Sequence, residues 1–225
     1  AQGLTTPLTS RIKKNITSPS QPPLDPSRMN KEARINNRLP FAREGFPFIF
    51  MGIGITIFFA WLGLATLTII AGAIALFVLY FFRDPERRHS GQKNAVMTPA
   101  DGRILEIKKL VGNDNPSGQP AIKVSIFMSV FNVHVNRIPI QGTIKKISYH
   151  PGKFLSANLD KASAQNESNR VTLTTADARE ILVIQIAGLI ARRIACWIDE
   201  GDTVETGQRF GLIRFGSRLE VFLPA

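Results

Sequence analysis

Cysteine is almost absent from this chain of 225 residues, since Cys196 is the only one. A single cysteine excludes an intramolecular disulfide framework and any metal site built from several cysteines. The composition is compatible with a reducing compartment, and we predict no metal site.

Charged residues are missing from a long internal stretch, because residues 45–82 contain no Asp, Glu, Lys or Arg. One helix of these 38 residues would be about 57 Å long, whereas a bilayer core is only about 30 Å thick. Two short helices that turn near Trp61, Leu62 and Gly63 fit that thickness, so we predict a transmembrane helical hairpin. One tilted span of about 25 residues with an interfacial stretch is the alternative.

Arginines flank the uncharged stretch on both sides. They are Arg34, Arg38 and Arg43 before it, and Arg83, Arg87 and Arg88 after it. Positive flanks favour the inner side of a membrane, so we expect the plasma membrane, with both ends of the hairpin and the following domain in the cytoplasm. The chain has 28 Lys and Arg against 17 Asp and Glu, a net charge of +11. No nucleic-acid-reading motif accompanies this charge, which favours an anionic membrane surface over nucleic acid.

The N-terminal residues 1–40 are rich in Pro, Ser, Thr, Asn and charge, and they show no apolar period. Such a segment buries too little surface to offset its chain entropy, so we predict a disordered basic tail. The sequence begins at Ala1, and Met29 is an alternative start.

Short apolar stretches separated by Gly, Pro and Asn follow Arg83, a pattern typical of β-strands. The predicted strands are residues 102–107, 121–127, 142–147, 170–173, 180–186 and 219–223. Residues 190–195 fit a helix or a strand. Strands this short predict a mainly β domain over residues 83–225, an antiparallel barrel or sandwich. Glycines around Val204 resemble those of barrel-sandwich hybrids, which speaks to the fold alone.

Three polar positions are candidates for chemistry, and each also has an ordinary structural explanation. His134 stands in an apolar strand-like segment, where a lone histidine is more often structural. Asp101 precedes Gly102, and Asp-Gly is usually turn chemistry. Ser217 follows Gly216 between two apolar runs, where such a step usually marks a bend or bulge.

Six motifs in order give these positions more weight. They are FFRDPER at 81–87, PADG at 99–102, FMSVFNVHVNRIP at 127–139, HPGKF at 150–154, DKAS with NE within 160–167, and RFGSR at 214–218. Over residues 40–225 the sequence resembles phosphatidylserine decarboxylase proenzymes of the short bacterial and archaeal type, which depend on a pyruvoyl group. The tail lies outside this resemblance.

The resemblance implies that the chain cuts itself between Gly216 and Ser217. The Ser217 hydroxyl attacks the Gly216 carbonyl, the amide becomes an ester, and β-elimination followed by hydrolysis leaves a pyruvoyl group. Glycine before serine permits the close approach and a strained backbone. The products would be a β chain, residues 1–216, and a nine-residue α chain, residues 217–225.

The resemblance also implies decarboxylation of phosphatidylserine to phosphatidylethanolamine in phospholipid biosynthesis, with the pyruvoyl group as the electron sink. His134 would return a proton to the carbon, because an unperturbed imidazole has a pKa near neutrality. Asp101 would orient or polarise groups during self-cleavage. Longer relatives carry a second histidine where this chain has Arg137, so the base that deprotonates Ser217 stays open.

Three more residues are candidates for binding the phospholipid substrate. His150 could contact its headgroup or belong to a loop, and Lys161 could pair with its phosphate or lie on the surface. Asn166 could shape the pocket or only turn a loop. A homodimer is expected from the family alone.

Other functions fit part of the pattern. A membrane-anchored β-barrel adaptor without catalysis is compatible with the composition and the hairpin. A serine hydrolase built from Asp101, His134 and Ser217 is disfavoured, because Ser217 lacks a nucleophile-elbow context. An archaetidylserine-type substrate is the alternative lipid.

Overall fold

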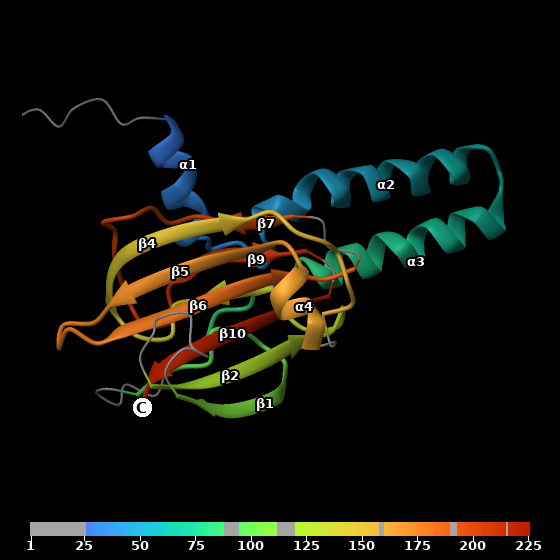
Figure 1. Cartoon of the computed structure of the whole chain (residues 1–225). Helices are drawn as coiled ribbons and strands as arrows, with labels where there is room; N and C mark the ends of the chain where they lie inside the picture. The colour runs from blue at the N-terminus through green and yellow to red at the C-terminus, as the bar shows by residue number, and fades with distance from the viewer. Residues whose placement is uncertain (1–25, 88–94, 112–119, 158–159, 190–192, 215) are drawn as a thin grey trace, which may run out of the picture.

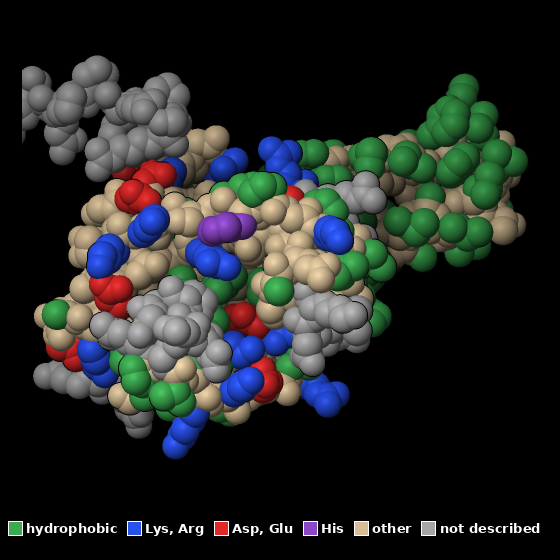
Figure 2. All heavy atoms as spheres, viewed as in Figure 1, with side chains coloured by type: hydrophobic (Ala, Val, Ile, Leu, Met, Phe, Trp, Pro, Cys, Tyr) green, Lys and Arg blue, Asp and Glu red, His purple; other side chains and the backbone are tan. Residues whose placement is uncertain are grey.

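A helical hairpin projects from a β-rich body (Figure 1). The computed structural model describes residues 26–87, 95–111, 120–157, 160–189, 193–214 and 216–225. Figure 2 shows hydrophobic side chains over the hairpin, while charged side chains gather on the β-rich body.

The hairpin consists of helices α2 (Phe46–Trp61) and α3 (Ala65–Phe81). Gly63 lies between them with a φ of +69°, a conformation that favours glycine. The predicted turn is therefore confirmed. A Cβ added to Gly52 would lie 3.1 Å from the Ala75 Cβ, so the small residue allows the helices to approach closely.

The length of these helices bears on the predicted membrane span. The stretch Arg43–Trp61 is long and apolar enough to cross a membrane, and the apolar helix Ala65–Phe81 is shorter, at 17 residues. A helix of that length measures about 26 Å, against a bilayer core of about 30 Å. Two helices are thus present, whereas their insertion into a membrane remains a proposal.

The larger sheet has seven antiparallel strands in the order β1-β2-β10-β6-β5-β4-β8. In chain order they are β1 (Arg103–Leu110), β2 (Ala121–Met128), β4 (Gly142–His150), β5 (Ser168–Thr174), β6 (Glu180–Ala187), β8 (Thr203–Val204) and β10 (Ser217–Pro224). All six predicted strands are confirmed within this sheet.

A smaller sheet has the order β3-β9-β7 and was not predicted. Its strands are β3 (Val135–Arg137), β9 (Arg209–Ile213) and β7 (Ile194–Cys196). Residues of both sheets, among them Ile126, Leu219, Phe210 and Ile213, share one hydrophobic core.

The predicted antiparallel β domain is confirmed, but of the two architectures that were predicted, barrel or sandwich, a closed barrel is not found, because the larger sheet does not close on itself. Strands β1 and β8 are its edges, and no pairing joins them among the described residues. Strands β3 and β7 each pair with β9 instead, and the three strands cover the core as a separate sheet.

Part of the segment predicted to be disordered is helical, because helix α1 spans Pro26–Ile35. The Lys31 Nζ lies 2.5 Å from carboxylate oxygens of Asp199 and Asp202, and Ile35 packs against the core. These long-range contacts hold α1 against the β-rich body. Residues 1–25 of the predicted tail lie outside the described residues.

Candidate active site

Ser217 begins β10, which lies inside the larger sheet. It stands opposite Met128 of β2 on one side and Ala187 of β6 on the other. Ser217 is 0% exposed. Because β10 is hydrogen-bonded on both sides, residues 217–225 would stay in place after a cut at the preceding peptide bond.

The backbone at Gly216 has a φ of +72°, in the left-handed region that favours glycine. A Cβ added to Gly188 would lie 2.0 Å from the Gly216 carbonyl oxygen and 2.9 Å from its carbon. The Gly188 backbone therefore lies against the carbonyl that Ser217 would attack. Sequence reasoning missed Gly188, for which the only signal was a glycine just after the predicted strand 180–186.

His134 faces the same peptide segment. The Gly216 N–H donates to His134 Nε2 over 3.2 Å, and His134 Nδ1 lies 2.9 Å from the Asn132 carbonyl oxygen. An N–H only donates and a carbonyl only accepts, so Nδ1 carries the proton and Nε2 is the acceptor. The structure thus brings His134 to the segment that contains Gly216 and Ser217.

The pKa of His134 differs from the value on which its predicted role relied. Burial, the main cause, lowers the pKa of His134 to about 4, and the positive charge of Arg83 adds to this effect. The hydrogen bond to Asn132 opposes it. The role of His134 was predicted from the unperturbed pKa of an imidazole, and desolvation accounts for the difference from that value. At neutral pH the ring is uncharged and can act as a base.

The Ser217 hydroxyl points to Met128, whose Sδ lies 3.9 Å from Oγ. A thioether sulfur is a weak acceptor. No hydrogen bond joins Ser217 Oγ to His134 among the described residues, so the attack on Gly216 requires the hydroxyl to rotate.

The end of the hairpin packs directly against the histidine. The Phe81 and His134 rings have their centroids 4.4 Å apart, and Phe81 is fully buried. Arg83 secures this junction, since its guanidinium donates to the Tyr80 carbonyl over 2.9 Å and to the Phe131 carbonyl over 2.7 Å. The site is thus continuous with the apolar hairpin.

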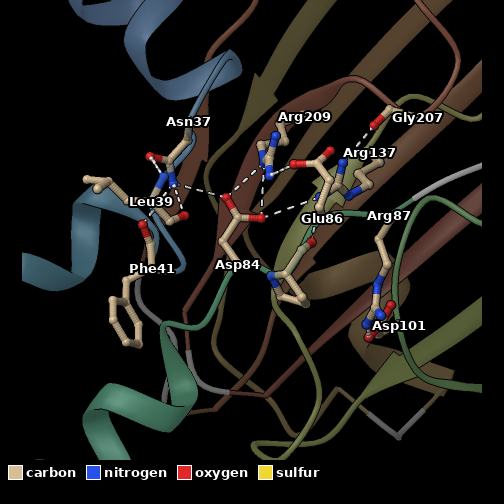
Figure 3. A network of polar contacts seen from close by, with 11 residues as sticks. Asn37, Leu39, Phe41, Asp84, Glu86, Arg87, Asp101, Arg137, Gly207 and Arg209 are labelled. Atoms are coloured by element: carbon tan, nitrogen blue, oxygen red, sulfur yellow. Dashed lines mark hydrogen bonds and ion pairs between the residues drawn. The ribbon is translucent and has the colours of Figure 1, made fainter.

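Arg137 belongs to a buried ion network centred on Asp84 (Figure 3). Asp84 accepts from Arg209 Nε over 2.8 Å, and its other oxygen lies 3.4 Å from Arg137 Nη2. Asn37 donates to Asp84 over 3.1 Å, and Arg137 donates to the Gly207 carbonyl over 3.0 Å. A guanidinium has no acceptor, so Arg137 anchors the segment after α3 and does not replace the second histidine.

Asp101 lies just before β1 and forms an ion pair with Arg87 (Figure 3). A cavity of about 120 Å³ lies between it and Val133 and Val135, the neighbours of His134. No hydrogen bond joins Asp101 to His134 or Ser217 in the described part of the chain.

The predicted substrate-binding residues lie at different distances from Ser217. His150 is exposed at the end of β4, three strands from β10, which corresponds to roughly 14 Å. Asn166 is buried, and its amide donates over 2.7 Å to the Leu155 and Ala187 carbonyls. Asn166 therefore fixes the strand end beside Gly188. Lys161 lies in α4 (Asp160–Gln165), and its side chain is outside the described part.

A sequence model of the phosphatidylserine decarboxylase family matches residues 74–225. The chain belongs to the phosphatidylserine decarboxylase family. The matched range begins inside α3 and includes Asp84, His134, Gly188 and Ser217, so the hairpin end and the site fall within the shared family region.

Proteins named phosphatidylserine decarboxylase proenzyme are similar to this chain. The one from Syntrophus aciditrophicus (strain SB) is 53% identical over 190 residues, which cover 81% of this chain and 86% of the relative. The one from Desulfotalea psychrophila is 48% identical over 187 residues, which cover 83% of this chain and 87% of the relative. The one from Ralstonia nicotianae is 47% identical over 203 residues, which cover 84% of this chain and 89% of the relative.

Proposed function

We propose that this member of the phosphatidylserine decarboxylase family is a precursor that cuts itself between Gly216 and Ser217, and that the processed enzyme converts phosphatidylserine to phosphatidylethanolamine. The observation that carries the proposal is the hydrogen bond of 3.2 Å between Gly216 N–H and the uncharged His134 Nε2. It joins the ring nitrogen to a glycine in the left-handed region, and the Gly188 backbone lies against the carbonyl of that glycine.

Self-cleavage begins with proton transfer from Ser217 Oγ to His134 Nε2 once the hydroxyl has rotated. Oγ then attacks the Gly216 carbonyl carbon, His134 Nε2 returns its proton to the peptide nitrogen, and the C–N bond breaks to leave an ester and a free amine at residue 217. Removal of the Ser217 Cα proton expels the Gly216 carboxylate. Water then replaces the nitrogen at residue 217, ammonia leaves, and a pyruvoyl group terminates the α chain.

The site residues fit a group formed at this position. Residue 217 is buried, and β10 is held by β2 and β6 after the cut. The pyruvoyl group supplies a ketone that takes up the substrate amine and accepts the electron pair released when CO₂ departs. His134 Nε2 holds the proton that the substrate ammonium loses and delivers it to the carbon. Asp101, across the small cavity, would orient the segment that carries His134.

The hairpin would anchor the enzyme where its substrate resides. Its exposed side chains are apolar, and α3 ends on Phe81 against His134. Arg34, Arg43 and Arg83 lie at the base of the hairpin, which favours the cytoplasmic side of the plasma membrane. A diacyl lipid could then reach the site without leaving the bilayer.

Carboxyl-labelled phosphatidylserine in detergent micelles tests this function. The wild-type chain should release labelled CO₂ and form phosphatidylethanolamine, whereas Ser217→Ala and a hydrazine-treated wild type should release neither. An adaptor would leave the lipid unchanged. A hydrolase would release serine or fatty acid without CO₂. Either of these last two results contradicts the proposal.

A further inference from the structure

A cavity of about 540 Å³ opens where the hairpin begins, between α1, the start of α2 and the segment after β9. Three arginines line it, Arg34, Arg43 and Arg214. They come from α1, from the short helix η1 (Arg43–Gly45) and from the end of β9, three segments that the fold brings together.

The positive charge of this cavity exceeds its negative charge. Glu44 is the single acidic residue among its described lining, and its Oε1 already lies 3.2 Å from Arg34 Nε as an ion pair and accepts from Trp197 Nε1 over 3.0 Å. Within the described residues, no carboxylate lies at ion-pair distance from Arg43 or Arg214. Burial and the nearby charge of Arg193 lower the pKa of Arg214, which Glu44 only partly offsets. An anion bound in this cavity would neutralise part of its excess positive charge.

The cavity lies at the boundary between the polar body and the apolar hairpin. The Arg214 guanidinium lies 5.2 Å from the centroid of the Phe48 ring, and Phe50, two residues further along α2, is exposed. Arginines at such a boundary lie at the level of the lipid phosphates in a bilayer. Arg214 is also two residues before Gly216, so their Cα atoms are at most about 7 Å apart.

We propose that this cavity binds the phosphodiester of the lipid whose serine headgroup reaches residue 217, which rests on the function proposed above. Arg43 and Arg214 form charge-assisted hydrogen bonds to the phosphate oxygens, a geometry that the planar guanidinium favours. The Phe48 ring lies on the side of the cavity that faces the acyl chains of the bound lipid. The phosphate is thereby held beside the cleavage site. Arg43 and Arg214, rather than His150, then contact the headgroup phosphate.

The test measures lipid binding in a chain that cannot react. Full-length Ser217→Ala with Trp61→Phe keeps Trp197 as its single tryptophan, and the indole of Trp197 contacts Glu44 in the cavity wall. Dioctanoyl phosphatidylserine is titrated in uncharged detergent micelles while Trp197 emission is followed. Arg43→Gln and Arg214→Gln should each weaken binding by about tenfold, the loss of one charge-assisted contact.

Arg38→Gln is the matched control, because Arg38 is exposed nearby and does not line the cavity. It should leave affinity within about twofold. Arg214→Lys should restore part of the binding, and circular dichroism identifies any variant that fails to fold. Equal affinities of folded Arg43→Gln, Arg214→Gln and Arg38→Gln would overturn the proposal.

Two further probes distinguish the source of the binding energy. Glycerophosphoserine should compete weakly, and inorganic phosphate should compete more weakly than glycerophosphoserine. Equal competition by inorganic phosphate would indicate a free-phosphate site, and equal binding of dioctanoylglycerol would indicate acyl-chain binding alone. Both results contradict the proposal. Because Ser217→Ala performs no chemistry, a failure of the proposed decarboxylation would leave this binding result intact.

Discussion

The Phe81 ring lies over the His134 ring, with centroids 4.4 Å apart. Phe81 is the last residue of α3, and His134 accepts the Gly216 N–H. One contact thus joins the apolar hairpin to the peptide segment that contains the cleavage site.

Truncation of Phe81 should change the protonation of His134. Phe81→Ala admits water to the ring, which reduces desolvation, so the pKa of His134 should rise from about 4 toward 6.5. Proton NMR titration of the histidines in the Ser217→Ala chain measures this shift. Phe77→Ala, one turn earlier in α3, is the control and should leave the pKa unchanged. An unchanged pKa in Phe81→Ala would show that the ring does not shield His134.

A methyl group at Gly188 should block self-cleavage. Its Cβ would lie 2.0 Å from the Gly216 oxygen, so the carbonyl must shift away from the geometry that Ser217 attacks. We expect Gly188→Ala to cleave at least about a hundredfold more slowly, as small displacements of reacting groups can cost this much. Denaturing gels over time measure the rate.

Gly54→Ala is the control for this substitution, because a Cβ there meets nothing within 4 Å. It should cleave at the wild-type rate. Wild-type cleavage by folded Gly188→Ala would remove Gly188 from the site.

The low pKa of His134 should make stability depend on pH. The folded-state pKa is depressed, so the unfolded chain binds the proton more readily, and stability is lost as pH falls from about 6.5 to about 4. Between pH 7 and pH 4.5 this loss should be roughly 2.5 kcal/mol. Denaturant unfolding of Ser217→Ala with and without His134→Gln isolates the contribution. The same pH slope in both chains would contradict a buried, uncharged His134.

Removal of the Asp84 charge should destabilise the body of the protein. Asp84→Asn leaves Arg137 and Arg209 buried beside a neutral amide, which should cost about 3 to 5 kcal/mol. Asp177→Asn breaks the exposed pair with Arg179 and should cost less than about 1 kcal/mol. Thermal unfolding measures both. Similar melting temperatures for the two variants would show that the buried network contributes little.

Much of the fold could be predicted from local pattern. The six long strands alternate with turn residues, and the hairpin follows from an uncharged stretch too long for one helix. The short strands were missed for a physical reason: β9 is buried throughout and β3 has only three residues, so neither shows alternation. Helix α1 was missed because the overall composition of residues 1–40 hides a short stretch of good helix formers, and its packing depends on partners of Lys31 about 170 residues away.

The candidate site was predictable in its residues and less so in its chemistry. His134, Gly216 and Ser217 are identified by motifs, and the structure brings them together. The role of Gly188 depends on strand register, which places the end of β6 beside Gly216. The pKa of His134 depends on burial, and the pairing of Asp101 with Arg87 depends on the path of the chain after α3. None of these follows from sequence neighbours.

The central claim is self-cleavage between Gly216 and Ser217, and intact-mass spectrometry of the purified full-length chain tests it most directly. The account predicts two species, residues 1–216 and a peptide of residues 217–225 whose blocked N-terminus reacts with hydrazine, while Ser217→Ala yields one uncut chain. A folded wild-type protein that keeps its full mass, or a cut that leaves a free serine amine at residue 217, would contradict it.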